Sequence, residues 1–124
     1  MKAFFAGIGL FFSTLVSCQQ KGEDFESVST DEFATLIADP DIQRLDVRTV
    51  AEYSEEHIPG SININVLDEQ FAVIADSTLQ KDKPIALYCR SGKRSKKAAT
   101  ILSRKGYKVY DLDKGFIGWK EAGK

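Results

Sequence analysis

Residues 87–95 read LYCRSGKRS, and they place the end of an apolar strand, a cysteine and the start of a basic helix next to one another. Cys89 closes the apolar run, Gly92 supplies a turn, and four residues separate Cys89 from Arg94. A loop that curls around a sulfur atom and leads into a helix directs backbone N–H groups and the positive end of the helix dipole at that atom. This field favours the thiolate, so the stretch predicts a reactive cysteine beside an anion-binding cradle.

The composition is that of a globular protein of one domain. The chain has 124 residues, of which 43% are hydrophobic and 28% charged, and its formal net charge is −1. Such a charge gives no bulk attraction to nucleic acid or to an anionic membrane, so any attraction for anions must be local. A cluster of five basic residues within eight positions supplies it: Arg90, Lys93, Arg94, Lys96 and Lys97. A solvated helix face is the alternative interpretation of this cluster.

The N-terminus has the features of an export signal. An apolar stretch of fourteen residues, 3–16, follows Lys2 and is too short to span a bilayer, and residues 15–18, LVSC, resemble a bacterial lipobox. Proteins with that motif carry lipid on its cysteine after cleavage. We therefore expect a lipoprotein signal peptide at 1–17, a lipid anchor on Cys18, a polar tether at 18–24, and a location in the periplasm or cell envelope. An ordinary signal peptide with an incidental cysteine is the alternative.

Cysteine usage supports a chemical role for Cys89. The chain has two cysteines, Cys18 and Cys89. With Cys18 lipidated, Cys89 would be the one thiol left in an exported protein, where cysteines are usually oxidised or absent. A disulfide between the two cysteines, or a small buried hydrophobe at a strand end, are the alternatives.

Strand and helix patterns alternate over residues 25–124, which we expect to form the folded domain. Apolar runs predict the strands, while amphipathic spacing and two capping boxes predict helices. Strands are expected at 25–28, 42–47, 61–64, 84–88 and 107–112, and helices at 30–38, 49–55, 66–74, 93–105 and 116–122. This order implies an α/β domain with a mainly parallel sheet and right-handed crossovers. Ligand sites in such sheets lie beyond the carboxyl ends of strands, where Cys89 is placed.

Four motifs follow one another along this domain, and a closing segment GFIGW at 115–119 comes after them. They are LDVR at 45–48, EY at 52–53, HIPGSIN at 57–63 and CRSGKRS at 89–95. In this order and approximate spacing they resemble a rhodanese domain of the single-domain, exported type. The resemblance covers almost all of residues 25–124. It implies a five-stranded parallel sheet between helices and sulfur transfer through a cysteine persulfide.

Together with the predicted thiolate, this resemblance leads to the hypothesis of a thiosulfate sulfurtransferase. Cys89 would attack the outer sulfur of an anionic donor such as thiosulfate, release sulfite, and pass the sulfur to a thiol or to cyanide. A thioredoxin-like protein is one candidate acceptor, and no cofactor is expected. The loop expected to bind the substrate consists of Arg90, Ser91, Gly92, Lys93, Arg94 and Ser95. Its backbone N–H groups would stabilise the sulfur anion, and Arg94, with Arg90 or Lys93, would bind the donor.

Other polar residues are expected to support the site. Asp46 and Arg48 lie at its edge, where they either steer the substrate or, in the interpretation we prefer, pair with neighbours to fix a turn. Glu52 is expected to cap a helix. His57 is expected to brace a turn rather than act as a base, and one histidine without a cysteine cluster gives little support to a metal site.

Two other classes of function stay open on the sequence. Cysteine-dependent phosphatases and arsenate reductases enclose a tetrahedral oxyanion with C-x5-R, whereas this chain has C-x4-R from Cys89 to Arg94. The shorter loop suits a persulfide sulfur better than a phosphoryl group. A non-catalytic binding module, or a sulfur carrier loaded by a protein partner, is the other class. The chain also departs from the family pattern at three positions, with Glu56 and Lys114 for common glycines and Ser61 for a common alanine.

Overall fold

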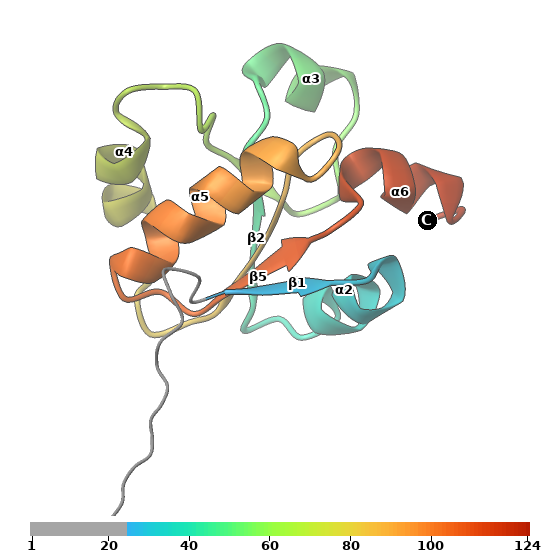
Figure 1. Cartoon of the computed structure of the whole chain (residues 1–124), viewed down its shortest axis with the longest axis horizontal. Coiled ribbons are helices and arrows are strands. Elements are labelled where there is room, and N and C mark those ends of the chain that lie inside the picture. The colour runs from blue at the N-terminus through green and yellow to red at the C-terminus, as the bar shows by residue number, and fades with distance from the viewer. Residues whose placement is uncertain (1–24) are drawn as a thin grey trace, which may run out of the picture.

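A parallel sheet forms the centre of the computed structural model, which describes residues 25–124 (Figure 1). Its strands are β1 (Glu26–Val28), β2 (Gln43–Asp46), β3 (Ile62–Asn63), β4 (Ile85–Tyr88) and β5 (Val109–Leu112). They lie in the order β1-β5-β4-β2-β3, and every neighbouring pair is parallel. The predicted α/β class with a five-stranded parallel sheet is confirmed.

Five helices cover the two faces of the sheet. They are α2 (Thr30–Ile37), α3 (Val50–Glu55), α4 (Phe71–Thr78), α5 (Lys93–Arg104) and α6 (Gly115–Glu121). No helix within residues 25–124 is long and apolar enough to cross a membrane. The expected signal peptide at 1–17, the lipidation site Cys18 and the tether at 18–24 lie outside the described residues.

Strand β4 divides the core because its side chains alternate between the two faces. Ile85, Leu87 and Cys89 belong to a buried cluster with residues of α4 and α5. Ala86 and Tyr88 belong to a second cluster with residues of α2 and α6. All residues of β4 are buried, as expected for a central strand of a parallel sheet that is covered on both sides.

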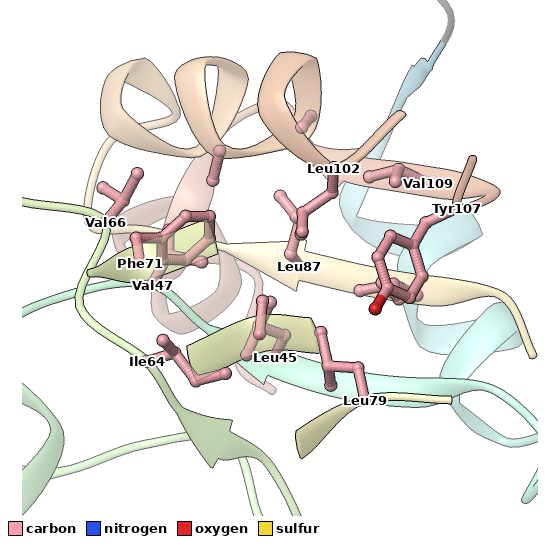
Figure 2. Close-up of a cluster of buried hydrophobic side chains, with 14 of the residues drawn as sticks. Leu45, Val47, Ile64, Val66, Phe71, Leu79, Leu87, Leu102, Tyr107 and Val109 are labelled. Atoms are coloured by element: carbon pink, nitrogen blue, oxygen red, sulfur yellow. The ribbon is translucent and has the colours of Figure 1, made fainter. Parts of the chain in front are cut away.

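The cluster beneath α5 fixes the helix that begins at the cysteine loop. Figure 2 shows Leu102 of α5 close to Leu87 of β4, with Leu45 of the neighbouring strand β2 further along the same face. All three side chains are fully buried. Burial of one leucine contributes about 1.5–3 kcal/mol, so this contact holds α5 firmly on the sheet.

Both predicted capping boxes are present. At α2, the Ser29 hydroxyl accepts the Glu32 N–H at 3.1 Å, and the Glu32 carboxylate accepts the Ser29 N–H at 2.9 Å. At α3, Thr49 and Glu52 make the same pair of bonds at 3.2 and 3.0 Å. Each box satisfies N–H groups that have no acceptor within the helix.

The helix expected over 66–74 is misplaced in the prediction. It is α4 in the structure, and its two ends lie five and four residues later. The side chain of Asn65 accepts the Leu67 N–H at 3.0 Å, and that of Asp68 accepts the Gln70 N–H at 2.8 Å. These turns compete with the helix for backbone donors. Leu67, expected on the apolar helix face, is 60% exposed. Every other predicted boundary lies within two residues of the structure.

Candidate active site

Cys89 follows β4 at the carboxyl edge of the sheet, as the sequence predicted. Its side chain is buried and carries a free thiol. The sulfur accepts the backbone N–H of Gly92 at a distance of 3.1 Å. In Figure 1 the loop that leads into α5 lies between α3 and α6. Because that loop curls back on the sulfur, at least one backbone dipole stabilises negative charge there.

Two glycines let this loop pack against the segment between β5 and α6. Gly92 has a φ of 100°, and a Cβ atom built there would lie 2.0 Å from the carbonyl oxygen of Asp113. Gly115 has a φ of 65°, and its Cβ would lie 2.4 Å from the carbonyl oxygen of Arg90. A side chain at either position would collide with backbone and strain the turn. The backbone of one loop therefore rests directly on the backbone of the other.

The loop directs its carbonyl oxygens and its N–H groups to different partners. The carbonyls of Cys89 and Arg90 accept the N–H groups of Phe116 and Ile117 at 2.8 and 3.0 Å. The N–H groups of Arg90 and Ser91 donate to no group within residues 25–124. The N-terminus of α5 also lacks a side-chain cap. The donors of the loop and of the helix start thus remain available to an anion.

Arg94 binds Glu52 of α3 instead of pointing freely into the loop. Its two terminal nitrogens donate to the two carboxylate oxygens at 2.8 and 3.0 Å. This hydrogen-bonded pair lowers the pKa of Glu52 to about 2, against the opposing effect of burial, and raises the pKa of Arg94. A Coulombic interaction with Cys89 adds to the rise in the pKa of Arg94, so the guanidinium lies within electrostatic range of the sulfur while it is bound to Glu52.

Asp46 and Arg48 form a buried ion pair under the site. The Arg48 guanidinium donates to the Asp46 carboxylate at 2.7 Å and to the Glu56 carbonyl at 2.7 Å. It also lies over the ring of Phe116, with 4.5 Å from the guanidinium carbon to the ring centre. These contacts tie β2, the end of α3 and the start of α6 together. They support the bracing interpretation of Asp46 and Arg48.

Lys96 anchors the loop from the opposite side. Its ammonium group donates to the carbonyl of Gly92 at 3.1 Å and to the carboxylates of Asp111 and Asp113 at 3.0 Å each. Asp111 is fully buried in β5, and one of its oxygens has no partner in the described part of the chain. Although burial works against the charge on Lys96, the two carboxylates raise its pKa.

The remaining predicted residues divide between the rim and the interior of the loop. Arg90, Ser91 and Lys93 are exposed. Ser95 is buried, and its hydroxyl has no partner among residues 25–124. His57 stacks on Tyr53 with 3.7 Å between ring centres, and its Nδ1 lies 2.8 Å from the Tyr53 carbonyl. This contact agrees with a bracing role for His57.

Sequence reasoning missed the ion pairs that surround the loop. The sequence predicts only a capping role for Glu52, which does cap α3 but also binds Arg94, 42 positions away. No local pattern in the sequence predicts the contacts of Asp111 and Asp113 with Lys96. One signal was available: parallel strands end at one edge, so acidic residues that follow β2 or lie at the end of β5 come near basic residues that follow β4.

A hollow of about 550 Å³ is lined by residues of β1, by the start of α2 and by residues at both ends of α6. Asp113 and Lys114 line it together with Ser27 and Ser29, whereas Cys89 does not. The chemistry suggested by the loop is therefore centred outside this hollow. No three His, Cys, Asp or Glu side chains of the described chain are grouped so that they could hold a metal ion.

Comparison with known families assigns this arrangement. The model of the rhodanese-like domain matches residues 29–122, which include the Cys89 loop and all the helices. The chain belongs to the rhodanese family. At the level of this family it is a rhodanese-type sulfurtransferase, since relatives whose names include sulfurtransferase match most of its length.

Two curated relatives and one solved structure illustrate the similarity. A protein named sulfurtransferase from Allochromatium vinosum is 32% identical over 98 residues, which cover 77% of this chain and 89% of the relative. Thiosulfate sulfurtransferase GlpE from Coxiella burnetii is 34% identical over 98 residues, with coverage of 77% and 88%. The crystal structure of a rhodanese-related protein from Thermoplasma volcanium has a TM-score of 0.67 at 31% identity, with coverage of 80% and 94%.

The three departures from the rhodanese pattern fit the local geometry. Glu56 has an extended backbone with a φ of −167°, which any residue adopts, and Lys114 has a φ of −91°. Neither position therefore requires glycine, unlike Gly115 next to it. The Ser61 hydroxyl donates to the Ile58 carbonyl at 2.7 Å. The departures leave the Cys89 loop unchanged.

Proposed function

We propose that Cys89 carries sulfur as a persulfide from an anionic sulfane-sulfur donor to a thiol or cyanide acceptor. The observation that carries this proposal is the bond from the Gly92 N–H to the Cys89 sulfur, in a loop whose N–H groups at Arg90 and Ser91 have no acceptor in the described chain. Such fixed donors stabilise a thiolate and a persulfide without reorganising, as an oxyanion hole stabilises an oxyanion.

The reaction consists of two displacements at sulfur. In the first, the Cys89 thiolate attacks the outer sulfur of thiosulfate, a new S–S bond forms, the donor S–S bond breaks, and sulfite leaves with the electron pair. In the second, the acceptor attacks the outer sulfur of the persulfide, and Cys89 leaves as the thiolate. Because Cys89 is buried, the added sulfur is the atom that the acceptor meets.

The surrounding side chains have distinct roles in this proposal. Arg90 and Lys93, exposed at the rim, attract the anionic donor from solution. The buried Ser95 hydroxyl, which lacks a partner within the described residues, donates to the bound sulfur. Arg94 is bound to Glu52 and acts on the thiolate from that position.

Mass spectrometry of the intact protein and of its proteolytic peptides tests the proposal. After incubation with thiosulfate, or with a persulfidated protein thiol as donor, the peptide that contains Cys89 is expected to gain one sulfur atom. Cyanide or a small thiol should remove it, and Cys89→Ser should not acquire it. A Cys89 peptide that gains no sulfur from either donor would overturn the proposal.

The same preparation separates the alternative functions. Uptake of sulfur from the protein donor alone would identify a sulfur carrier. Hydrolysis of p-nitrophenyl phosphate without sulfur transfer would identify a phosphatase. The bidentate pair with Glu52 argues against the phosphatase, because a phosphatase needs the arginine of this loop on the phosphoryl oxygens.

We also propose that the protein works outside the cytoplasm. The support is the sequence of residues 1–18, with its apolar run and the lipobox-like end at Cys18. Labelling with an alkyne fatty acid in a bacterial host should mark the wild-type protein and leave Cys18→Ala unmarked. A thioredoxin-like protein in that compartment is a chemically suitable acceptor, and its discharge of the persulfide can be followed in the same mass spectra.

A further inference from the structure

The cations around Cys89 form an inner and an outer group with different charge balance. In the inner group, Arg48, Arg94 and Lys96 are each bound to at least one carboxylate. The outer group is Arg90 and Lys93, which are exposed and make no ion pair within residues 25–124. The basic sequence of the loop therefore does not make a strongly positive interior.

The pair between Arg94 and Glu52 is built to persist. It has two parallel hydrogen bonds, the geometry that makes arginine–carboxylate pairs strong and specific. Glu52 is held in place on its own helix because one carboxylate oxygen accepts both the N–H and the hydroxyl of Thr49 at 3.0 Å. The side chains of Arg94 and Glu52 are only 25% and 24% exposed, so water competes weakly for the hydrogen bonds between them.

This pairing affects donors of different charge unequally. A dianion such as thiosulfate gains most from an unpaired guanidinium near the sulfur, and it feels the Glu52 carboxylate most strongly as a repulsive charge. A donor with a single negative charge needs less compensation, and the backbone N–H groups of the loop can supply it. Removal of the Glu52 charge should thus help a dianion more than a monoanion.

We propose that Glu52 is a positioning residue that makes the site select monoanionic sulfane-sulfur donors over the thiosulfate dianion, a proposal that rests on persulfide formation at Cys89. Hydropersulfides and thiosulfonates, R–SO2–S⁻, belong to this class of donor. With methanethiosulfonate, the Cys89 thiolate attacks the terminal sulfur, the S–S bond of the donor breaks, and methanesulfinate leaves with the electron pair. The reaction matches that of thiosulfate in bonds and electrons and differs in one unit of donor charge.

The test compares kcat/KM for methanethiosulfonate and thiosulfate in the wild type, Glu52→Gln and Glu55→Gln. Glutamine keeps the capping box of α3, and Glu55 is an exposed residue of the same helix that makes no ion pair within the described chain. We expect Glu52→Gln to raise the value for thiosulfate relative to methanethiosulfonate about tenfold, as expected for one extra charge near the site. Glu55→Gln should leave the ratio unchanged.

Two further measurements keep the result interpretable. Glu52→Asp, which keeps the negative charge, should keep the wild-type ratio. Free 2-mercaptoethanol gives the intrinsic ratio of the rate constants for methanethiosulfonate and thiosulfate. The ratio of kcat/KM values for the wild type should favour methanethiosulfonate more strongly than this intrinsic ratio. An unchanged ratio in a folded Glu52→Gln protein, or a wild type that favours thiosulfate over this reference, would overturn the selectivity proposal. Absence of any persulfide from both donors would instead overturn the proposed function.

Discussion

The helix starts of α3 and α5 lie next to each other and are built in opposite ways. At α3, Thr49 and Glu52 form a capping box that satisfies two backbone N–H groups, their own. At α5, Gly92 has a φ of 100° and provides no side-chain cap. A capped start is satisfied by its own sequence, whereas an uncapped start leaves donors that an anion can bind. Helices α4 and α6 also begin without a side-chain cap, but among the described helices only α5 follows the loop that bonds the Cys89 sulfur.

An ion pair also connects the starts of α3 and α5. Glu52 caps α3 and binds Arg94 in the first turn of α5. One carboxylate therefore closes its own helix and neutralises a cation of the neighbouring helix. The proposed action of the open start of α5 therefore relies on backbone dipoles more than on net positive charge.

Closing the open start should have the largest effect. Gly92→Ala places a methyl group where the Asp113 carbonyl lies 2.0 Å away, in a backbone region that alanine rarely adopts. The loop must then move, and the Gly92 N–H leaves the Cys89 sulfur. We expect sulfur transfer to fall about a hundredfold or more, as measured by the rate of persulfide formation.

Gly123→Ala is the matched control for that change. Gly123 also has a positive φ of 77°, but a Cβ there meets no atom within 4 Å. Its substitution should cost a little stability and leave the transfer rate at the wild-type value. Equal rates for the two variants would contradict the role given to the Gly92 loop.

Removal of Lys96, which anchors the loop before α5, should have the next largest effect, and that effect should be on stability. Lys96→Met takes the cation away from Asp111, which is fully buried and already has one oxygen without a partner in the described chain. A buried charge that loses its partner costs several kcal/mol, but Lys96 is 42% exposed and water screens part of the loss. Urea unfolding should give a loss of about 2 kcal/mol.

Lys97→Met separates this anchoring from the general charge of the helix. Lys97 is the next residue of α5, is exposed, and makes no ion pair within residues 25–124. Its substitution should change the free energy of unfolding by less than about 0.5 kcal/mol. A similar loss in both variants would mean that the bonds from Lys96 to Asp111 and Asp113 contribute little.

Acid should weaken the ion pair between Glu52 at the start of α3 and Arg94 at the start of α5. The pKa of Glu52 falls from 4.5 to about 2 because Arg94 binds its carboxylate, so folding favours the ionised form. This stabilisation is complete above the pKa of the unfolded chain and is lost as the pH falls toward 2. Between neutral pH and about pH 3.5 the wild type should lose about 1.5 kcal/mol through this group.

Glu52→Gln cannot titrate at this position and serves as the reference for the acid series. Its free energy of unfolding should fall less over the same pH range, by about the amount assigned to Glu52. The difference between the two proteins is the measured quantity, because other carboxylates titrate in both. Parallel pH curves would show that Arg94 does not stabilise the ionised form.

The comparison also explains which features could be predicted from the sequence. The capping boxes and the order of strand, cysteine, turn and helix depend on neighbouring residues, so their spacing sufficed. The bond between Arg94 and Glu52 depends on which strands are adjacent, and a separation of 42 positions gives no local sign of it. At α4 the local signals themselves conflicted, because Asn65 and Asp68 form turns within the apolar spacing.

Removal of the Ser29 cap at the start of α2 should have the smallest effect, and that effect should be confined to stability. Ser29→Ala removes the hydroxyl that accepts the Glu32 N–H at the start of α2, while Ser29→Asp keeps an acceptor there. The alanine variant should lose about 1 kcal/mol in urea unfolding, and the aspartate variant should stay near the wild type. Both should transfer sulfur at the wild-type rate, because the bonds of this box run to Glu32 and not to the Cys89 loop. A transfer rate that fell with the cap would mean that capped helix starts also position the sulfur, and the distinction between α5 and the capped helices α2 and α3 would then be lost.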